Sequence, residues 1–219
     1  ITPELVKLLK DERIRVRANC IWVLGEIKAE KAVNSLIDAL KDKRNRPSWI
    51  LYALGKIGDT LAVKSIIPYL RNKSAINRVA ACFALGRIGL PRELFKLISL
   101  LDDKEIPVRI ASENALVKLG DTIIIPLINK FDELKKPGKI HAINVFSRLL
   151  DTLDLPKRNK VIGLLKNILQ AEDRAIRMHA VDALGKLVSD PGVRNLLQNN
   201  MIYETDPVII KRYKKYLNQ

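Results

Sequence analysis

The chain of 219 residues is 47% apolar but only 5% aromatic, which is enough to bury a continuous aliphatic core. Its 39 Lys and Arg outnumber its 24 Asp and Glu, and the resulting net charge of +15 favours acidic partners such as nucleic acid or acidic protein. No apolar run is long enough to cross a bilayer, and the two cysteines lie 62 residues apart without a CxxC pair, which argues against a zinc site or a disulfide scaffold.

A short motif of leucine, glycine and a charged residue recurs along the chain. Its clear copies are Leu24-Gly25-Glu26, Leu54-Gly55-Lys56, Leu85-Gly86-Arg87 and Leu184-Gly185-Lys186. Altered copies, Leu116-Val117-Lys118 and Phe146-Ser147-Arg148, occupy the gap, and a weaker seventh copy includes Tyr216. Successive copies are 30 to 38 residues apart, a period that predicts one elongated repeat protein over residues 1–219.

Each copy predicts two helices. The segment 33–40 has apolar residues at the i, i+3, i+4 and i+7 positions of a first helix, and the segment 108–119 carries the motif of a second helix. Gly58, Gly89 and Gly120 follow the second helices and predict C-caps, where glycine adopts positive φ at little cost. The motif glycine lies inside a helix, where it costs roughly 1 kcal/mol against alanine, and its recurrence predicts a close helix–helix approach.

The second helices resemble HEAT repeats of the short phycobilisome-lyase-like type. The family pattern of Asp, Val-Arg and Ala-Leu-Gly is found in three clear copies, which are Asp11 with Val16-Arg17 and Leu24-Gly25, Asp103 with Val108-Arg109 and Ala115-Leu116, and Ile176-Arg177 with Ala183-Leu184-Gly185. The resemblance implies an all-α fold, an α-solenoid with a right-handed superhelix of about seven helical hairpins. It also implies that the second helices line a concave wall, and the family includes both scaffolds and a few enzymes.

Three segments depart from the regular period. The first hairpin starts late and the chain begins with Ile, so we expect a trimmed N-terminus and a missing upstream repeat. The 38-residue gap predicts a longer polar loop over 151–159 between repeats five and six. The segment 208–217 predicts a C-terminal helix that closes the stack with a polar face.

A basic column stands seven residues before the motif leucine. It consists of Arg17, Arg78, Arg109, Lys139 and Arg177, with Pro47 in the second repeat. The column could bind phosphate, but the resemblance favours a structural ladder in which each arginine joins the aspartate and the carbonyls of the preceding turn.

An aromatic stripe stands two residues before the leucine in the first three repeats. It comprises Trp22, Tyr52 and Phe83, joined by Trp49 one turn before Tyr52, whereas the later repeats have Asn114, Asn144 and Asp182. The stripe could form a groove that binds a peptide or unpaired bases, or the rings could pack on one another or on a missing repeat.

Two further columns contain residues that could carry chemistry. His141 and His179 share a column, but alanine follows each of them, and the glutamates through which HEAT-like deoxyhypusine hydroxylases bind iron are absent. Glu113 stands at an apolar column, where a core-facing carboxylate would need a partner or a raised pKa. It could act as a catalytic acid or base, but a salt bridge to a nearby Arg or Lys, or a small rotation of the helix, is the favoured interpretation. No catalytic, metal or cofactor residue is predicted.

The positive charge is concentrated along one edge. The turns between first and second helices, with the starts of the second helices, carry almost all of the net charge and comprise residues 10–17, 41–47, 71–78, 102–109, 130–139, 166–177 and 211–215. The opposite turns sum to zero. The predicted contacts of this edge with an acidic polymer are Arg15, Lys43, Arg44, Arg46, Lys73, Lys135 and Lys136. A lysine-rich composition alone would not explain this placement.

The sequence therefore predicts a cytoplasmic, non-catalytic interaction scaffold that binds an acidic macromolecule, either nucleic acid or protein, without a membrane or cofactor. A HEAT-like enzyme is the alternative, because such DNA glycosylases use concave Trp residues with a nearby Asp, and chromophore lyases share the repeat. A subunit of a larger assembly is the third possibility.

Overall fold

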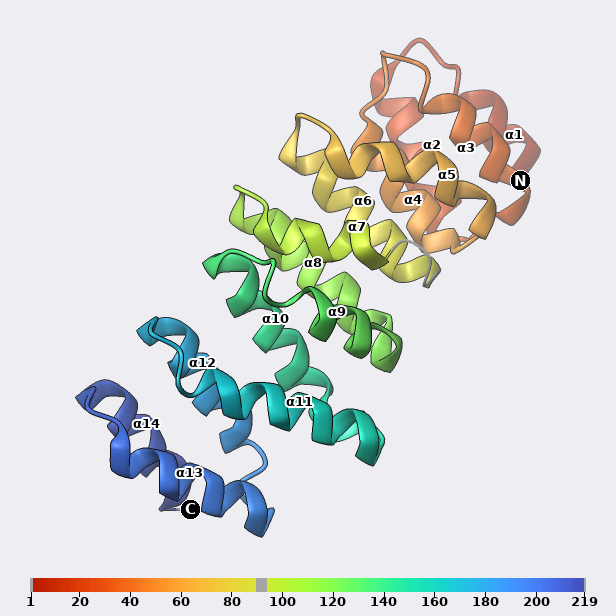
Figure 1. The fold of residues 1–219 in the computed structure, drawn as a ribbon. Helices are drawn as coiled ribbons and strands as arrows, with labels where there is room; N and C mark the ends of the chain where they lie inside the picture. Colours follow the sequence, from red (N-terminus) through yellow and green to blue (C-terminus); the bar gives the residue numbers. More distant parts are fainter. Residues whose placement is uncertain (1, 90–93, 219) are drawn as a thin grey trace. The chain divides into compact units, whose positions relative to one another are not determined.

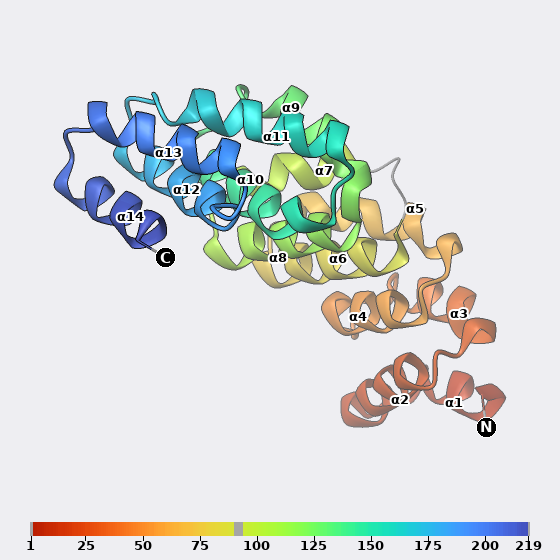
Figure 2. The ribbon, with the colours of Figure 1, turned by 90° about the horizontal axis from the view of Figure 1, so that it is seen from below.

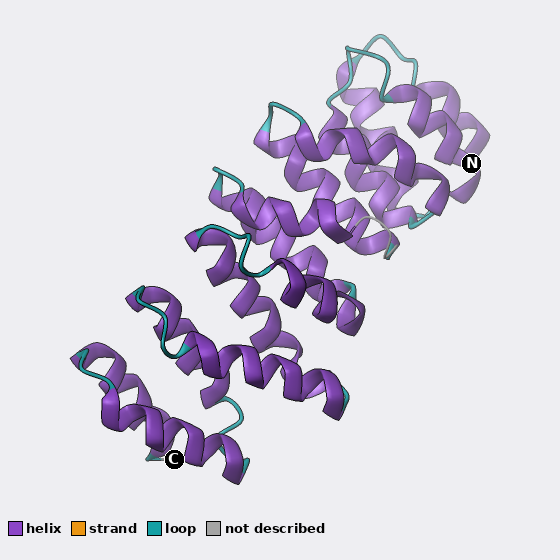
Figure 3. Cartoon of the chain, in the orientation of Figure 1, coloured by secondary structure: helices purple, strands orange, loops and turns teal. Residues whose placement is uncertain are grey.

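The computed structural model describes residues 2–89 and 94–218, and it confirms the all-α prediction, since none of these residues lies in a strand (Figures 1 and 3). The helices of these described residues alternate as seven hairpins, in agreement with an α-solenoid of HEAT type. The chain divides into two compact units, Ile1–Leu119 and Gly120–Gln219. We call them unit 1 and unit 2.

Unit 1 contains four hairpins. Its first helices are α1 (Thr2–Leu8), α3 (Val33–Ala39), α5 (Val63–Ile66) and α7 (Leu94–Ser99), and its second helices are α2 (Ile14–Glu26), α4 (Pro47–Ile57), α6 (Ala75–Ile88) and α8 (Ile106–Lys118). Short 3-10 turns extend the first helices at η1 (Glu30–Ala32), η2 (Thr60–Ala62), η3 (Ile67–Arg71) and η5 (Leu100–Asp102). The second helices pack side by side in chain order, as Figure 2 shows for α6 and α8.

Unit 2 contains three hairpins. They are formed by α9 (Ile124–Lys130) with α10 (Lys136–Leu149), α11 (Leu155–Ile168) with α12 (Arg174–Gly185), and α13 (Pro191–Tyr203) with α14 (Pro207–Leu217). The 3-10 turns η6 (Gly120–Ile123) and η7 (Leu150–Thr152) flank the first of these hairpins. Within this unit, α12 packs against both α10 and α14.

The motif glycines allow the second helices to approach closely, as predicted. A Cβ placed on Gly25 would lie 2.9 Å from the Cα of Ala53, and one placed on Gly86 would lie 2.7 Å from the Cα of Ala115. The neighbouring backbone cannot move aside as a flexible side chain would, so only glycine fits. In unit 2 the corresponding neighbour of Gly185 is the ring of Tyr216.

The predicted C-caps are confirmed at the ends of α4 and α6. Gly58 and Gly89 have φ of 84° and 82°, in the left-handed region that glycine adopts most cheaply. Gly120 also has positive φ, directly after α8. The carboxylate of Asp59 then accepts a hydrogen bond from the N–H of Leu61, as an N-cap of the next turn.

The arginine ladder is confirmed, with one correction. The guanidinium of Arg78 donates to the carbonyls of Asn72 and Lys73 in its own turn, at 2.9 and 3.1 Å. Arg17, Arg109 and Arg177 repeat this pattern at the equivalent carbonyls. The carboxylate partner, however, comes from the following repeat rather than the preceding turn. Asp103 lies 2.7 Å from Arg78, and the side chains are 9% and 7% exposed.

Burial by itself would raise the pKa of Asp103, but it is outweighed. Hydrogen bonds from Arg78 and from the N–H of Glu105, together with the charge of Arg78, hold the pKa of this carboxyl below its usual value. Asp103 is therefore ionised inside unit 1 and joins two neighbouring hairpins.

The ladder is interrupted at the second repeat because Pro47 begins α4 three residues later, relative to the motif leucine, than the other second helices begin. Buried Asn45 takes two roles in the ladder here, as the acceptor that Asp103 provides for Arg78 and as the donor to a preceding carbonyl. Its side-chain oxygen accepts from Arg17 at 2.8 Å, and its amide donates to the carbonyl of Ala39 at 3.1 Å. In unit 2, Lys139 departs from the ladder and lies 5.6 Å from the ring of Phe131.

The prediction of a longer polar loop over 151–159 is wrong. Asp154 caps α11 by accepting from the N–H of Lys157, and Pro156 lies in the first turn, where its missing N–H costs nothing. The extra residues of this repeat therefore lengthen its first helix to 14 residues, compared with 7 in α9.

The assignment of residues 211–215 to the basic edge is also wrong. These residues lie within α14, and the turn that precedes α14 contains two acids, Glu204 and Asp206. These residues lie one to five positions before Tyr216, inside the second helix, whereas the turns of the other repeats end seven positions before the motif leucine. Within unit 2, the concentration of positive charge at the turns therefore does not extend to the last hairpin.

Candidate functional site

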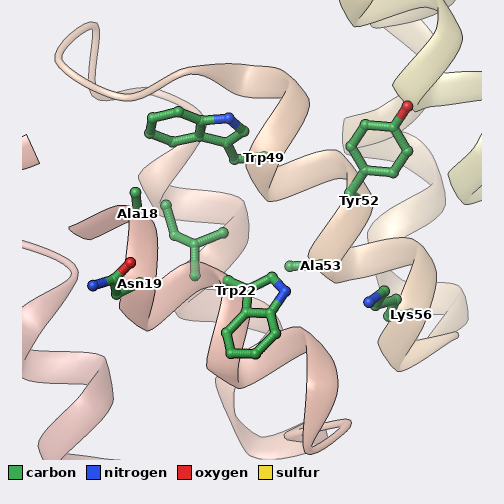
Figure 4. Close-up of a pocket in the computed structure, with 8 residues that line it drawn as sticks. Ala18, Asn19, Trp22, Trp49, Tyr52, Ala53 and Lys56 are labelled. Carbon is green, nitrogen blue, oxygen red and sulfur yellow. The ribbon is translucent and has the colours of Figure 1, made fainter. Parts of the chain in front are cut away.

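The structure brings the aromatic residues of the first two second helices together around a groove. The aromatic groove, as we call it, has a volume of about 490 Å³ and lies between α2 and α4 (Figure 4). Its lining residues are Ala18, Asn19, Ile21, Trp22, Trp49, Tyr52, Ala53 and Lys56. The floor is apolar, and the lining contains no carboxylate.

The rings of this groove differ in exposure. Trp22 is 63% exposed, although it is the largest side chain of α2. Trp49 is half-buried, and the guanidinium of Arg46 lies 5.1 Å from its ring. Tyr52 is also half-buried, and this burial raises the pKa of its hydroxyl, which is therefore neutral and able to donate a hydrogen bond.

A second cavity continues from Tyr52 toward α8. We call it the basic groove. It has a volume of about 370 Å³ and is lined by Tyr52, Val79, Phe83, Gly86, Arg87, Ala111, Asn114, Ala115 and Lys118. The rings of Tyr52 and Phe83 are 4.9 Å apart between centroids and tilted by 56°, an ordinary packing geometry for an aromatic pair. Phe83 thus joins the stripe by packing on its neighbour, whereas Trp22 remains exposed.

The predicted cations of the turns fall into different environments. Arg15, Lys43 and Lys73 are exposed and have no acidic partner among the described residues. Arg44 is paired with Asp42 at 2.8 Å and with Glu12 at 3.2 Å. These hydrogen bonds from Arg44 lower the pKa of Asp42 to about 2.

The two predicted cations of unit 2 are Lys135 and Lys136. Lys136 forms an ion pair with Asp173 at 2.7 Å, and exposed Lys135 occupies the N-cap position of α10. The hydrogen bond from Lys136 also lowers the pKa of Asp173. Of the seven predicted cations, Arg15, Lys43 and Lys73 are thus the ones that remain exposed without an ion pair or a stacked ring.

Sequence analysis missed a second row of cations. Lys56, Arg87 and Lys118 each stand two residues after the motif leucine, in the last turns of α4, α6 and α8, and each lines one of the two grooves. These cations are the charged residues of the repeated motif. The motif alone does not predict a binding site, because a cation in the last turn of a helix also offsets the helix dipole.

The polar residues that replace the aromatic stripe in unit 2 are bound internally. Asn144 lies 3.2 Å from the Nδ1 of His179, and Asp182 accepts from the hydroxyl of Tyr216 at 3.0 Å and from Arg212 at 3.3 Å. Burial, followed by the bond to Asp182, raises the pKa of Tyr216 to about 12. His141 is half-buried on α10. The described residues contain no cluster of three or more His, Cys, Asp or Glu that could hold a metal ion.

Glu113 is half-buried, whereas the apolar residues at this column of the other repeats are buried. Its neighbour Ser112 is buried, as is the residue at that position in the other second helices, and it donates to the carbonyl of Leu97. Ala115 and Leu116 are buried like their counterparts, so α8 shows no rotation relative to the column pattern. The two cysteines, Cys20 and Cys82, are buried free thiols whose pKa is raised by that burial.

The model of the family described as HEAT repeats matches residues 1–50 and 47–117 of the sequence. This chain belongs to the HEAT-repeat family. Among solved structures, the complex of CpcE and CpcF of phycocyanin lyase from Nostoc sp. PCC7120 is similar over 100% of this chain and 94% of that chain, with 21% identity and a TM-score of 0.56. The archaeal HEAT-like repeats protein from Thermococcus onnurineus NA1 is similar over 100% and 96%, with 18% identity and a TM-score of 0.59.

At such identities these structures show that this chain shares their fold. No curated protein matches the sequence. None of the helices in the described parts of this HEAT-repeat chain is both long and apolar enough to span a membrane.

Proposed function

We propose that this HEAT-repeat chain is a non-catalytic interaction scaffold, and that unit 1 binds an acidic macromolecule with its aromatic groove and the cations of its turns. The observation that carries the proposal is the 63% exposure of Trp22 at the border of an apolar groove of about 490 Å³. Exposed Trp residues in concave apolar sites are common anchors of protein partners, and their removal costs about 2 kcal/mol or more of binding free energy.

The exposed cations of the turns support the acidic nature of the partner. Arg15, Lys43 and Lys73 belong to three successive hairpins of unit 1, and the turns between first and second helices lie along one edge of that unit (Figure 3). Their charges are not neutralised by neighbouring acids in the described structure. Such a row attracts an acidic partner at a distance and accelerates association at low salt.

A second candidate is a subunit of a larger assembly. The similar phycocyanin lyase structure is a complex of two proteins, CpcE and CpcF. In that case the partner in the groove would be another folded subunit, which would bury Trp22 in a permanent interface. Light scattering of the purified chain over a range of concentrations tests whether the chain associates with itself.

Intrinsic fluorescence offers a direct test, because both Trp residues of the chain line the aromatic groove. The protein is titrated with poly-L-glutamate and with a single-stranded oligonucleotide of thymidines, at low and at moderate salt. We expect at least one probe to change the Trp emission, and its affinity to fall as salt increases.

Two variants locate the binding. Trp22→Ala, read through the remaining Trp49, should weaken binding by about tenfold or more. Lys43→Glu should weaken it more than Lys31→Glu, which changes the same charge at an exposed lysine of the opposite turn. If neither probe changes the emission at low salt, the proposed function is contradicted.

A further inference from the structure

The two grooves of unit 1 differ in chemistry in a way that specifies what they bind. We propose that their occupant is an extended protein segment with an apolar side chain at one end and acidic side chains about five residues away. The apolar side chain lies between Trp22 and Trp49, and the carboxylates lie on Arg87 and Lys118. This inference rests on the proposed function and names the partner class for the same surface.

The aromatic groove provides the apolar end. Its floor includes Ile21, which is 1% exposed, and Ala53, which is 3% exposed, so a side chain that enters meets a closed apolar surface. The indoles of Trp22 and Trp49 border the same space from α2 and α4 (Figure 4). The volume of about 490 Å³ accepts a large aliphatic or aromatic side chain with its flanking backbone.

The basic groove provides the acidic subsite. Arg87 and Lys118 are exposed, line the same cavity and have no carboxylate partner in the part of the chain that the structure describes. The guanidinium of Arg87 lies 5.9 Å from the ring of Phe83, which supports it beside the cavity. A carboxylate here would gain charge-assisted hydrogen bonds, each worth about 1.5–3 kcal/mol.

The two ends form one path because Tyr52 lines both grooves. The path runs from the α2–α4 pair to the α6–α8 pair, which is two helix spacings, or about 16–20 Å. An extended chain covers this length in about five or six residues. The spacing between the apolar and acidic side chains of the partner is therefore fixed by the repeat.

The cation of the aromatic groove argues for a protein segment over a nucleic acid. Lys56 is the one cation that lines this groove, and it already forms an ion pair with Glu26 of the neighbouring helix. A nucleic acid carries a phosphate at every nucleotide and needs cations along its whole path. The lining instead changes from neutral at Trp22 to positive at Lys118, which matches a segment whose charge is at one end.

The test is mRNA display of random 12-residue peptides against the full chain. Parallel selections use Trp22→Ala, the double variant Arg87→Gln/Lys118→Gln, and the control Lys31→Gln/Lys64→Gln. The control removes the same charge from exposed lysines of unit 1 that line neither groove. We expect peptides with an aliphatic or aromatic residue and at least two acids about four to six residues away.

The best-enriched peptide is then synthesised and its affinity measured for each variant. We expect about tenfold weaker binding to Arg87→Gln/Lys118→Gln, which corresponds to the loss of one charge-assisted hydrogen bond, and less than about twofold for the control. A version of the peptide with Gln in place of its acids should bind the wild type more weakly than the parent peptide does. This version should bind the double variant and the wild type with equal affinity.

Two outcomes overturn this inference without affecting the proposed function. They are enriched peptides without acids, and thymidine oligonucleotides that bind the groove while no peptide is enriched. An enriched peptide that binds Trp22→Ala and the double variant as well as the wild type contradicts both, because its site is then elsewhere.

Discussion

The second helices of the two units share one geometry but present different side chains two residues before the motif leucine. In unit 1, Trp22 and Tyr52 occupy this position and border an open groove. In unit 2, Asn144 and Asp182 occupy it, and their oxygens are bound by groups of the next second helix. HEAT hairpins therefore accept either aromatic or hydrogen-bonded polar residues at this column. The column decides whether a face is closed by its own hydrogen bonds or left open to a partner.

In both units, the arginine ladder should contribute more to the free energy of unfolding than the side chains two residues before the motif leucine. Asp103→Ala in unit 1 leaves Arg78 buried without its carboxylate, and we expect a loss of about 3 kcal/mol in the free energy of unfolding. Glu204→Ala in unit 2 removes the partner of Arg177, which is more exposed, and should cost less. Urea denaturation followed by circular dichroism measures both. Equal losses of unfolding free energy for Asp103→Ala and Glu204→Ala would contradict the expectation that the more buried ion pair stabilises the fold more.

The same pair predicts a pH dependence. Because the pKa of Asp103 is lower in the folded chain, its contribution is fully present above about pH 4 and is lost as the pH falls through the folded pKa. Asp103→Asn should therefore flatten the loss of unfolding free energy below about pH 4. An unchanged slope in that window would show that Asp103 is not the titrating group.

The motif glycine should tolerate no larger residue. Gly86→Ala places a Cβ 2.7 Å from the Cα of Ala115, and we expect a loss of about 1–3 kcal/mol from overpacking. Gly163→Ala on α11 is the matched control, because a Cβ there meets no atom within 4 Å. It should stabilise the helix by up to about 1 kcal/mol. Equal effects of the two changes in urea denaturation would contradict the close approach of α6 and α8.

The two units are compared most directly by one variant in each, measured for both unfolding free energy and groove binding. Asp182→Ala in unit 2 leaves the half-buried hydroxyl of Tyr216 without its acceptor and should cost about 1–2 kcal/mol of unfolding free energy. Trp22→Ala in unit 1 should cost no more than about 0.5 kcal/mol of unfolding free energy, because the ring is mostly exposed, yet it should weaken groove binding by about tenfold or more. If Trp22→Ala destabilised the chain as much as Asp182→Ala, the ring would be part of the fold.

The smallest expected effect separates two neighbouring cations of one turn. Arg44 is paired with Asp42 and Glu12, whereas Lys43 has no acidic partner among the described residues. Lys43→Gln should therefore weaken the binding of an acidic probe by about twofold to threefold, and Arg44→Gln by less. Fluorescence titration at low salt measures both, and a larger effect for Arg44 would contradict the assignment.

The repeat itself made most of the fold predictable from sequence. The motif glycine, the capping glycines and the ladder arginine each have one physical reason to recur, so their spacing defined the hairpins before the structure was known. The wrong predictions concern two segments in which the local sequence departs from the repeated pattern. Asp154 and Pro156 start a long helix in a segment that appeared to be a loop, and the basic residues 211–215 lie inside the last second helix and not in the turn before it.

The site was only partly predictable. The aromatic column placed Trp22, Trp49 and Tyr52 on one surface, because residues that share a register share a face. Sequence could not show that Arg44 is neutralised by acids of its own and a neighbouring turn. Nor could it show that Arg87 and Lys118 line a cavity, since the same residues also suit the C-terminal end of any helix.

The central claim is that the open face of unit 1 binds the partner, and amide hydrogen exchange tests it most directly. The chain is compared alone and saturated with the best-enriched display peptide. The account predicts slower exchange in α2, α4, α6 and α8, with α12 and α14 unchanged. Protection confined to α12 and α14, or to the first helices, would contradict it.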